Sequence, residues 1–114
     1  MKPCGIRIWT NQLQQTKDFY TKTLPFEIKV DGSKDGWFVV GTPTIDLIIE
    51  LDDGAESSRY LGASFQVEDI HDTYRELCEK GVEFNGAPKQ QEWGGWLVGF
   101  KDNTGNVWTV VQNG

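Results

Sequence analysis

Apolar and polar side chains alternate over residues 4–10, which is the pattern of a strand with one buried face. From Leu13 the apolar positions change to helical spacing, which continues to Leu24. We expect Asn11 to cap this helix and Pro25 to end it. Alternating segments separated by turns that contain Gly or Pro then predict three strands, over residues 26–30, 37–41 and 45–51.

The same order of patterns starts again after an acidic loop at residues 52–59. A strand is expected over residues 62–67, and Asp69 can cap a helix whose apolar positions run from Ile70 to Gly81. This half is expected to end in β-structure, at residues 82–84, 92–100 and 107–112. Each half therefore predicts one strand, one helix and three further strands.

The second half repeats the first at an offset of fifty-seven positions, which brings Gly5 onto Gly62 and Leu13 onto Ile70. Identity between the halves is weak, but their periodicities agree. We therefore predict an α+β fold in which two βαβββ modules, about residues 1–53 and 60–114, form one domain over residues 1–114. Their strands are expected to make a curved mixed sheet that encloses a cleft, with the helices on its outer face.

Composition and charge narrow the class of protein. The 114 residues suffice for a single domain, and no apolar stretch is long enough to cross a membrane. The net charge of −6 argues against a nucleic-acid partner, because phosphates attract clustered Lys and Arg. The first residues lack the apolar core of a signal peptide, and Cys4 and Cys78 lack the spacing of a zinc site. We therefore expect buried, reduced thiols in a cytoplasmic protein.

Two segments, DFYTKTLPFEI and FKDNTGNVWTV, carry a resemblance to a known family. The first is similar to the pattern FY-x-x-x-LGF, with Pro25 in place of Gly. The second is similar to F-x-DPDGN-x-x-x-L, with Asn103 and Thr104 in place of Pro and Asp. On these motifs the chain resembles the vicinal oxygen chelate superfamily, which includes glyoxalase I, extradiol dioxygenases, and bleomycin and fosfomycin resistance proteins. The resemblance covers nearly the whole chain and implies the duplicated fold.

Members of that superfamily that use a metal resemble one another in four ligands, a His or Gln, a Glu, a second His and a second Glu. The resemblance places these positions at Gly5, Glu50, Gly62 and Thr109. Of the four, Glu50 alone has a ligating side chain, and one carboxylate does not make a metal site. The single histidine, His71, is expected to be exposed early in the second helix. We therefore expect no metal and no cofactor, which disfavours metal-dependent glyoxalase or dioxygenase chemistry.

Strand parity predicts what lines the cleft instead. Arg7 and Glu50 face it from the first module, where they either pair with each other or one of them meets a charged ligand. Glu50 is also the one candidate for a catalytic acid or base. Tryptophans favour a flat ligand, although core or interface packing explains any single one of them. The predicted ligand-binding residues are Arg7, Trp9, Trp37, Glu50, Ser64, Gln66, Trp93, Trp96 and Thr109.

Three functions stay open. The first is a metal-free small-molecule-binding protein, similar to the bleomycin-sequestering members, that takes a planar or cationic ligand in a Trp-lined cleft. The second is a lyase or other glyoxalase-type enzyme with an atypical site built on Glu50. The third is an effector-sensing or protein-interaction module. The resemblance also implies a homodimer, and the loop between the modules is expected to act as a hinge or lid.

Overall fold

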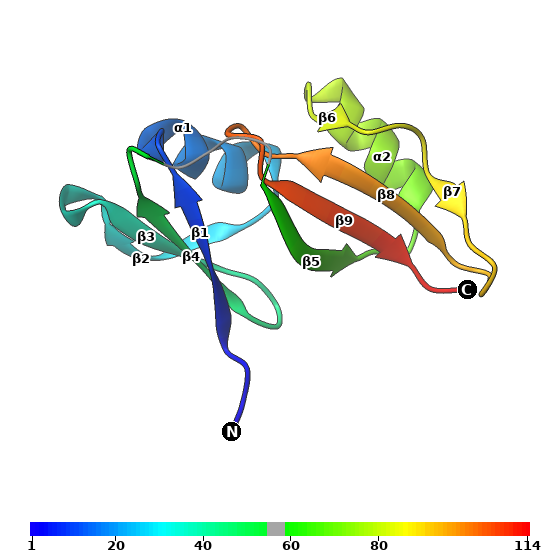
Figure 1. The fold of residues 1–114 in the computed structure, drawn as a ribbon, viewed down its shortest axis with the longest axis horizontal. Coiled ribbons are helices and arrows are strands. Elements are labelled where there is room, and N and C mark those ends of the chain that lie inside the picture. The colour runs from blue at the N-terminus through cyan, green and yellow to red at the C-terminus, as the bar shows by residue number, and fades with distance from the viewer. Residues whose placement is uncertain (55–58) are drawn as a thin grey trace. The chain divides into compact units, whose positions relative to one another are not determined.

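The computed structural model describes residues 1–54 and 59–114, and the chain divides into two compact units, Met1–Glu56 and Ser57–Gly114 (Figure 1). Each unit holds one mixed sheet, which confirms the predicted α+β class. In the described part of the chain no helix is long and apolar enough to span a membrane. The loop expected to act as a hinge lies partly outside the described residues, and a single domain around a shared cleft stays a prediction.

Unit 1 has the predicted order of one strand, one helix and three strands. Its four-stranded sheet runs β1-β4-β3-β2, with β1 parallel to β4 and the other pairs antiparallel. The helical segment continues beyond α1 as a π-helical stretch and stops before Pro25. The elements are β1 (Gly5–Thr10), α1 (Leu13–Asp18), the π-helix (Phe19–Thr23), β2 (Glu27–Gly32), a 3-10 turn (Ser33–Asp35), β3 (Trp37–Gly41) and β4 (Asp46–Leu51).

The core of unit 1 lies between α1 and one face of this sheet. Ile8, Ile49 and Phe38 are paired neighbours on β1, β4 and β3, and all three are fully buried. The buried hydroxyls of Thr10 and Thr16 lie 2.8 Å apart and join the end of β1 to α1 on the same face. The alternation in residues 4–10 therefore predicted correctly which side chains of β1 lie under the helix.

The start of α1 differs from the prediction. Gln12, not Asn11, occupies the N-cap position, and its side chain makes no capping hydrogen bond. The Gln12 N–H donates instead to the Thr10 hydroxyl at 3.0 Å, and that hydroxyl also contacts Thr16. A buried threonine at the end of the preceding strand thus accepts a backbone N–H at the start of the helix.

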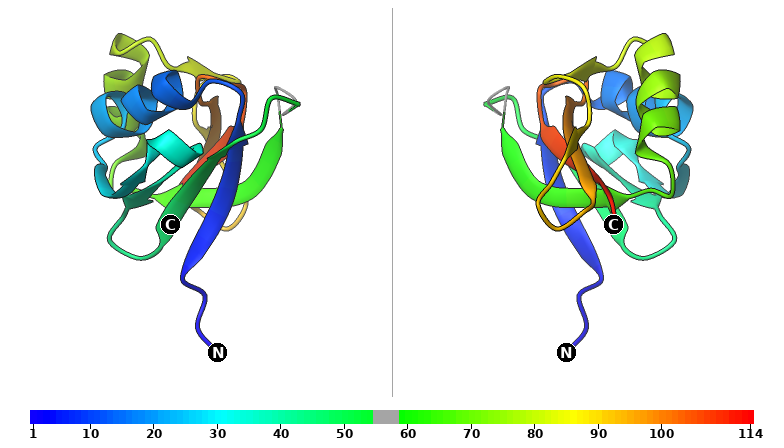
Figure 2. Two further views of the ribbon diagram at one scale, coloured as in Figure 1. Left: turned by 90° about the vertical axis from the view of Figure 1, so that its left-hand side faces the viewer. Right: turned by 90° about the vertical axis from the view of Figure 1, so that its right-hand side faces the viewer.

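Unit 2 repeats this arrangement with one additional short strand. Its sheet runs β5-β9-β8-β6, β5 is parallel to β9, and β7 pairs with the free part of β8. The continuous β-structure expected over residues 92–100 is wrong, because a turn separates β7 from β8. The elements are β5 (Tyr60–Gln66), α2 (Ile70–Glu79), β6 (Glu83–Phe84), β7 (Lys89–Gln90), β8 (Trp96–Lys101) and β9 (Val107–Gln112) (Figure 2).

Stacked aromatic rings form the core of unit 2. The ring of Trp108 stacks on Phe65 at a centroid distance of 4.1 Å, and Phe100 stacks on the same Phe65 at 6.2 Å. Tyr74 of α2 contacts this face of the sheet through the edge of Phe84, with centroids 4.8 Å apart. Trp108 and Phe100 are each 1 % exposed, so this face carries the hydrophobic stabilisation of the unit.

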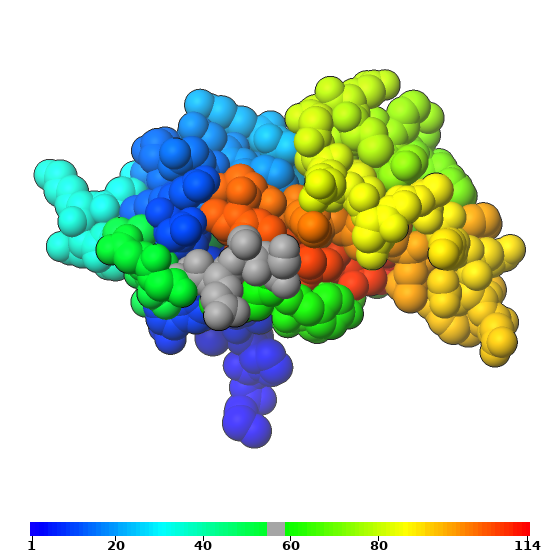
Figure 3. All heavy atoms as spheres, turned by 45° about the horizontal axis from the view of Figure 1, so that its top comes forward, coloured from blue at the N-terminus to red at the C-terminus, as the bar shows by residue number. Residues whose placement is uncertain are grey.

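The N-terminus of α2 is as predicted. The Asp69 side chain accepts hydrogen bonds from the backbone N–H groups of His71 and Asp72, both at 3.1 Å. These bonds favour the ionised carboxylate, so they hold the pKa of Asp69 below its usual value, with the Asp72 N–H as the largest cause. The prediction of buried thiols is wrong, because Cys4 and Cys78 are both exposed. Cys4 belongs to the N-terminal residues before β1, which project from the rest of unit 1 (Figure 3).

Gly62 lies where the pairing of β5 with β9 is irregular. The pairing of β5 with β9 shifts register between Tyr60 and Ser64, and Gly62 between them has a φ of +69°. We expect Gly62→Ala to lower the free energy of unfolding by about 1 kcal/mol, because a left-handed backbone strains any residue with a Cβ. Urea unfolding followed by circular dichroism measures the change.

Gly41→Ala is the matched control for this strain. Gly41 also lies in a strand, but its φ is not positive, and an added Cβ would meet Lys29 atoms at an ordinary 3.9 Å. At Gly62 an added Cβ would meet nothing within 4 Å, so only the backbone angle separates the two positions. Equal losses in the two variants would contradict the prediction.

Candidate functional site

A row of three side chains crosses unit 1 on the face opposite α1. Trp9 of β1 pairs with Glu50 of β4, and Glu50 pairs in turn with Trp37 of β3. Directly paired neighbours in a sheet project to the same side, so a carboxylate stands between two indoles. We call Trp9, Glu50 and Trp37 the tryptophan row. The structure brings together here three residues that strand parity and composition predicted for ligand binding.

Arg7 forms an ion pair with the carboxylate of this row. Its Nε lies 2.8 Å from Oε1 of Glu50, and the two side chains are 53 % and 32 % exposed. The Arg7 guanidinium also lies over the Trp9 ring, with Cζ 5.8 Å from the ring centroid. The pairing is the first of the two arrangements that the sequence left open. It also shows that a planar cation fits beside Glu50 and over an indole.

Gly32 lets the Trp37 indole lie against the backbone of the edge strand β2. A Cβ added at Gly32 would come within 2.2 Å of Trp37 Cε2, so any larger residue would displace the ring. The next row of the same face is apolar at Ile48 and Val39, which pair directly. Trp37 is therefore held in place by glycine on one side and by a sheet surface beside it.

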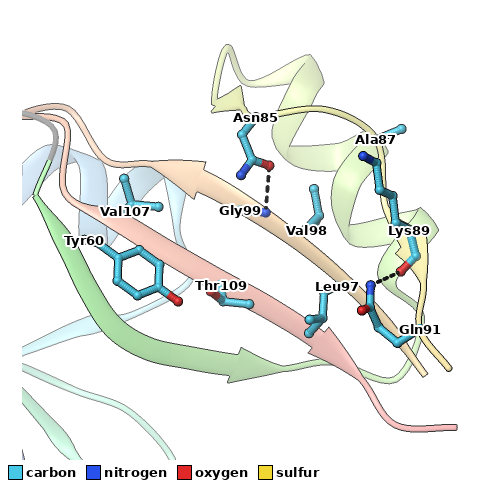
Figure 4. A pocket seen from close by; sticks show the side chains of 10 residues that line it. All are labelled: Tyr60, Asn85, Ala87, Lys89, Gln91, Leu97, Val98, Gly99, Val107 and Thr109. Atoms are coloured by element: carbon cyan, nitrogen blue, oxygen red, sulfur yellow. Dashed lines mark hydrogen bonds between the residues drawn. The ribbon is translucent and has the colours of Figure 1, made fainter. Parts of the chain in front are cut away.

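Unit 2 contains a pocket of about 310 Å³ on the sheet face that carries Thr109 (Figure 4). Its floor is formed by β8 and β9, and its walls come from the start of β5 and from the chain between β6 and β8. No acidic residue is among those that line it. The lining residues are Tyr60, Asn85, Ala87, Lys89, Gln91, Leu97, Val98, Gly99, Val107 and Thr109.

Three predicted site residues lie on this face of unit 2, but only one of them lines the pocket. Thr109 lines it and pairs with Ser64 of β5. Gln66 pairs with Val111, two residues farther along the same strands, and so projects to the same side as Ser64. Ser64 and Gln66 are exposed and lie outside the lining.

Trp93 and Trp96, on either side of Gly94 and Gly95, are placed differently from the other predicted tryptophans. Trp96 pairs with Gln112, whose Oε1 accepts the N–H of Ile70 at the start of α2, and the Trp96 ring contacts His71 at 4.6 Å. Trp96 therefore lies on the helix side of the sheet, away from the pocket. Trp93 is 55 % exposed in the turn before β8 and lines neither the pocket nor the tryptophan row. His71 is exposed, as predicted.

The residues at the four expected metal-ligand positions do not fit a metal. A Cβ at Gly5 would lie 2.9 Å from the backbone oxygen of Asp46, and Gly62 has the left-handed backbone already described. Backbone geometry therefore explains both glycines. Thr109 is a weak ligand, and Glu50 is paired with Arg7. Over residues 1–54 and 59–114 no three His, Cys, Asp or Glu side chains cluster closely enough to hold an ion.

The sequence did not single out Tyr60, Asn85 or Lys89. Tyr60 has an even number, like Ser64 and Gln66 of the same strand. If the strand predicted over residues 62–67 had been started at residue 60, Tyr60 would have been predicted on the same face as those two residues. Asn85 and Lys89 lie in or beside segments too short to show a period, and pairing with β8 puts them at the pocket. No local pattern in the sequence reports that pairing.

Comparison with known proteins gives consistent results. Residues 5–110 match the model of the Glyoxalase/Bleomycin resistance protein/Dioxygenase superfamily. The chain is 34 % identical to the uncharacterized protein YetH of Bacillus subtilis over 94 % of each chain. A superfamily member from Sphaerobacter thermophilus has a similar crystal structure, with a TM-score of 0.88 and 28 % identity over 99 % of this chain and 98 % of that one.

A third similarity concerns the fold alone. The structure of a bleomycin resistance determinant encoded on the transposon Tn5 superposes with a TM-score of 0.78 and 20 % identity. The alignment covers 99 % of this chain and 98 % of that one, so the whole architecture is shared.

Proposed function

Because the chain belongs to the Glyoxalase/Bleomycin resistance protein/Dioxygenase superfamily, we propose that it binds a small planar cation with its own side chains and without a protein-bound metal. The tryptophan row is the observation that carries this proposal. It places one carboxylate between two indoles on a sheet face that no helix of unit 1 covers. Indole faces attract cations and stack on flat rings, and the carboxylate supplies the opposite charge.

The contacts of Glu50 support the binding of a second cation. The shortest contact between Arg7 and this carboxylate joins Nε to Oε1 at 2.8 Å, on the side where the guanidinium lies over Trp9. A ligand amidinium or ammonium can therefore approach on the Trp37 side while Arg7 stays on the Trp9 side. The carboxylate is only one-third exposed, so a ligand charge there is less screened than at an open surface.

Benzamidine is a suitable probe, because it joins a flat ring to a planar cation. We expect it to bind and to change tryptophan fluorescence, and we expect Glu50→Gln to weaken the binding by about fivefold through loss of the charge pair. Glu27→Gln is the matched control, since Glu27 is an exposed carboxylate on the edge strand β2 of the same sheet. Titration followed by fluorescence and calorimetry measures both affinities.

Two results would contradict this proposal. The first is that neutral benzamide binds as tightly as benzamidine, which would show that the charge of Glu50 plays no part. The second is that a divalent ion raises the melting temperature of the protein but not that of Glu50→Gln. That outcome would favour the glyoxalase-type enzyme with an atypical site on Glu50. A homodimer and a cytoplasmic location remain parts of the proposal, carried over from the resemblance and the composition.

A further inference from the structure

We propose that the pocket of unit 2 is a binding site for a small planar carboxylate, with the acid group at Lys89 and the ring over Leu97. This goes beyond the proposed function, because it concerns the other unit and a ligand of opposite charge. The two sites share no residue, so either proposal can fail without the other. Figure 4 shows the side chains that carry the argument.

Charge is the first support for this site. Lys89 is the one charged residue among those that line the pocket. In the described part of the chain its ammonium group has no ion-pair partner, whereas Lys101 at the other end of β8 pairs with Glu83 at 3.3 Å. The chain as a whole carries a net charge of −6, so this pocket is a local region of positive charge in an acidic protein. An anionic ligand would supply the charge opposite to that of Lys89.

A second donor is fixed by the backbone. The N–H of Gly99 donates to Oδ1 of Asn85 at 3.1 Å, and the N–H of Asn85 donates to the Gly99 carbonyl at 3.0 Å. The side-chain amide is thereby oriented, with its oxygen on Gly99 and its Nδ2 turned away from that bond (Figure 4). Nδ2 has no hydrogen-bond partner among the described residues. The amide is therefore a second hydrogen-bond donor on the wall of the pocket.

Gly99 makes this orientation possible. A Cβ at residue 99 would lie 2.7 Å from Asn85 Nδ2, so a larger residue would push the amide out of place. The absence of a side chain on this part of β8 also leaves the floor of the pocket flat.

The apolar part of the pocket fits a ring. Leu97 lies on the pocket side of β8 directly opposite Lys89, whereas Val107 and the 69 % exposed Tyr60 line the other end of the pocket. A volume of about 310 Å³ suits one small ring with its acid group.

Benzoate, benzamide and benzylamine test the charge preference, because they keep the ring and change only the polar group. In calorimetric titrations of the full chain we expect benzoate to bind, benzamide to bind at least about fivefold more weakly, and benzylamine to bind more weakly still. Lys89→Met keeps the aliphatic stem and should weaken benzoate binding by about tenfold. Lys80→Met removes the same charge outside the pocket and should leave the affinity unchanged.

Backbone chemical shifts locate the bound probe. Benzoate should move the amide signals of Gly99 and Thr109 and leave that of Trp37 in place. Equal affinity in Lys89→Met and the wild type would overturn the proposal, as would shifts centred on β4 or no binding up to about 10 mM benzoate. Glu50→Gln should bind benzoate normally and Lys89→Met should bind benzamidine normally, so failure of one site is distinguishable from failure of the other.

Discussion

Trp108→Ala is expected to lower the free energy of unfolding by about 4 kcal/mol, as for other large aromatic residues truncated in a packed core. Trp108 is 1 % exposed and stacks on Phe65, which in turn stacks on Phe100. Removing the indole would leave a cavity in the middle of this group of rings and remove their shared contacts. Urea unfolding followed by far-ultraviolet circular dichroism measures the loss independently of tryptophan fluorescence.

Trp93→Ala is the matched control, since it makes the same chemical change at a tryptophan that is 55 % exposed. We expect it to cost less than about 1 kcal/mol, because little buried surface is lost. If Trp108→Ala does not fold, Trp108→Phe leaves a smaller cavity and should fold with an intermediate loss. Equal losses for the two alanine variants would mean that the stacked rings of unit 2 are not its main source of stability.

Asp102→Ala is expected to have the next largest effect, a loss of about 3 kcal/mol. Asp102 is 6 % exposed and organises the turn between β8 and β9. Its Oδ1 accepts from the backbone N–H groups of Thr104 and Asn106 and from the Thr104 hydroxyl, and its Oδ2 accepts from Nδ2 of Asn106. Alanine would leave the two buried Asn106 donors and the two half-buried Thr104 donors without their acceptor, which costs more than the bonds themselves contribute.

Asp52→Ala makes the same substitution in an exposed turn. Asp52 Oδ1 accepts from the Gly54 N–H at 2.9 Å, and water can replace that bond, so we expect a change within about 0.5 kcal/mol. Asp102→Asn should give an intermediate loss, because one acceptor becomes an NH₂ group that faces the Asn106 amide. Thermal unfolding of the three variants ranks them, and a ranking with Asp52→Ala as the most destabilised would refute this account of the turn.

Periodicity was sufficient where a strand or helix is long and has one buried face. It placed Ile8 and Ile49 in the core and Trp9 and Glu50 on the other face, because parity within a regular strand follows from the backbone alone. The cap at Asp69 was likewise predictable, since a short acidic side chain before an apolar period has few alternatives.

Other parts of the candidate site depend on pairing between distant segments, which no local pattern shows. The helix-side position of Trp96 follows from its pairing with Gln112, whereas from the sequence Trp96 was predicted to be among the ligand-binding residues. The pocket positions of Asn85 and Lys89 follow from their hydrogen bonds with β8. At the start of α1 the difference is local, since the Thr10 hydroxyl accepts the N–H of Gln12 two residues later.

In both units the first strand is hydrogen-bonded to the last, β1 to β4 and β5 to β9. During synthesis on the ribosome, the sheet of unit 1 can close once residue 51 has left the exit tunnel. Unit 2 must wait for residues 107–112, because β9 lies between β5 and β8 and no earlier strand bridges them. The aromatic side chains of β5 and β8 are therefore exposed to chaperones and to other nascent chains until translation reaches β9.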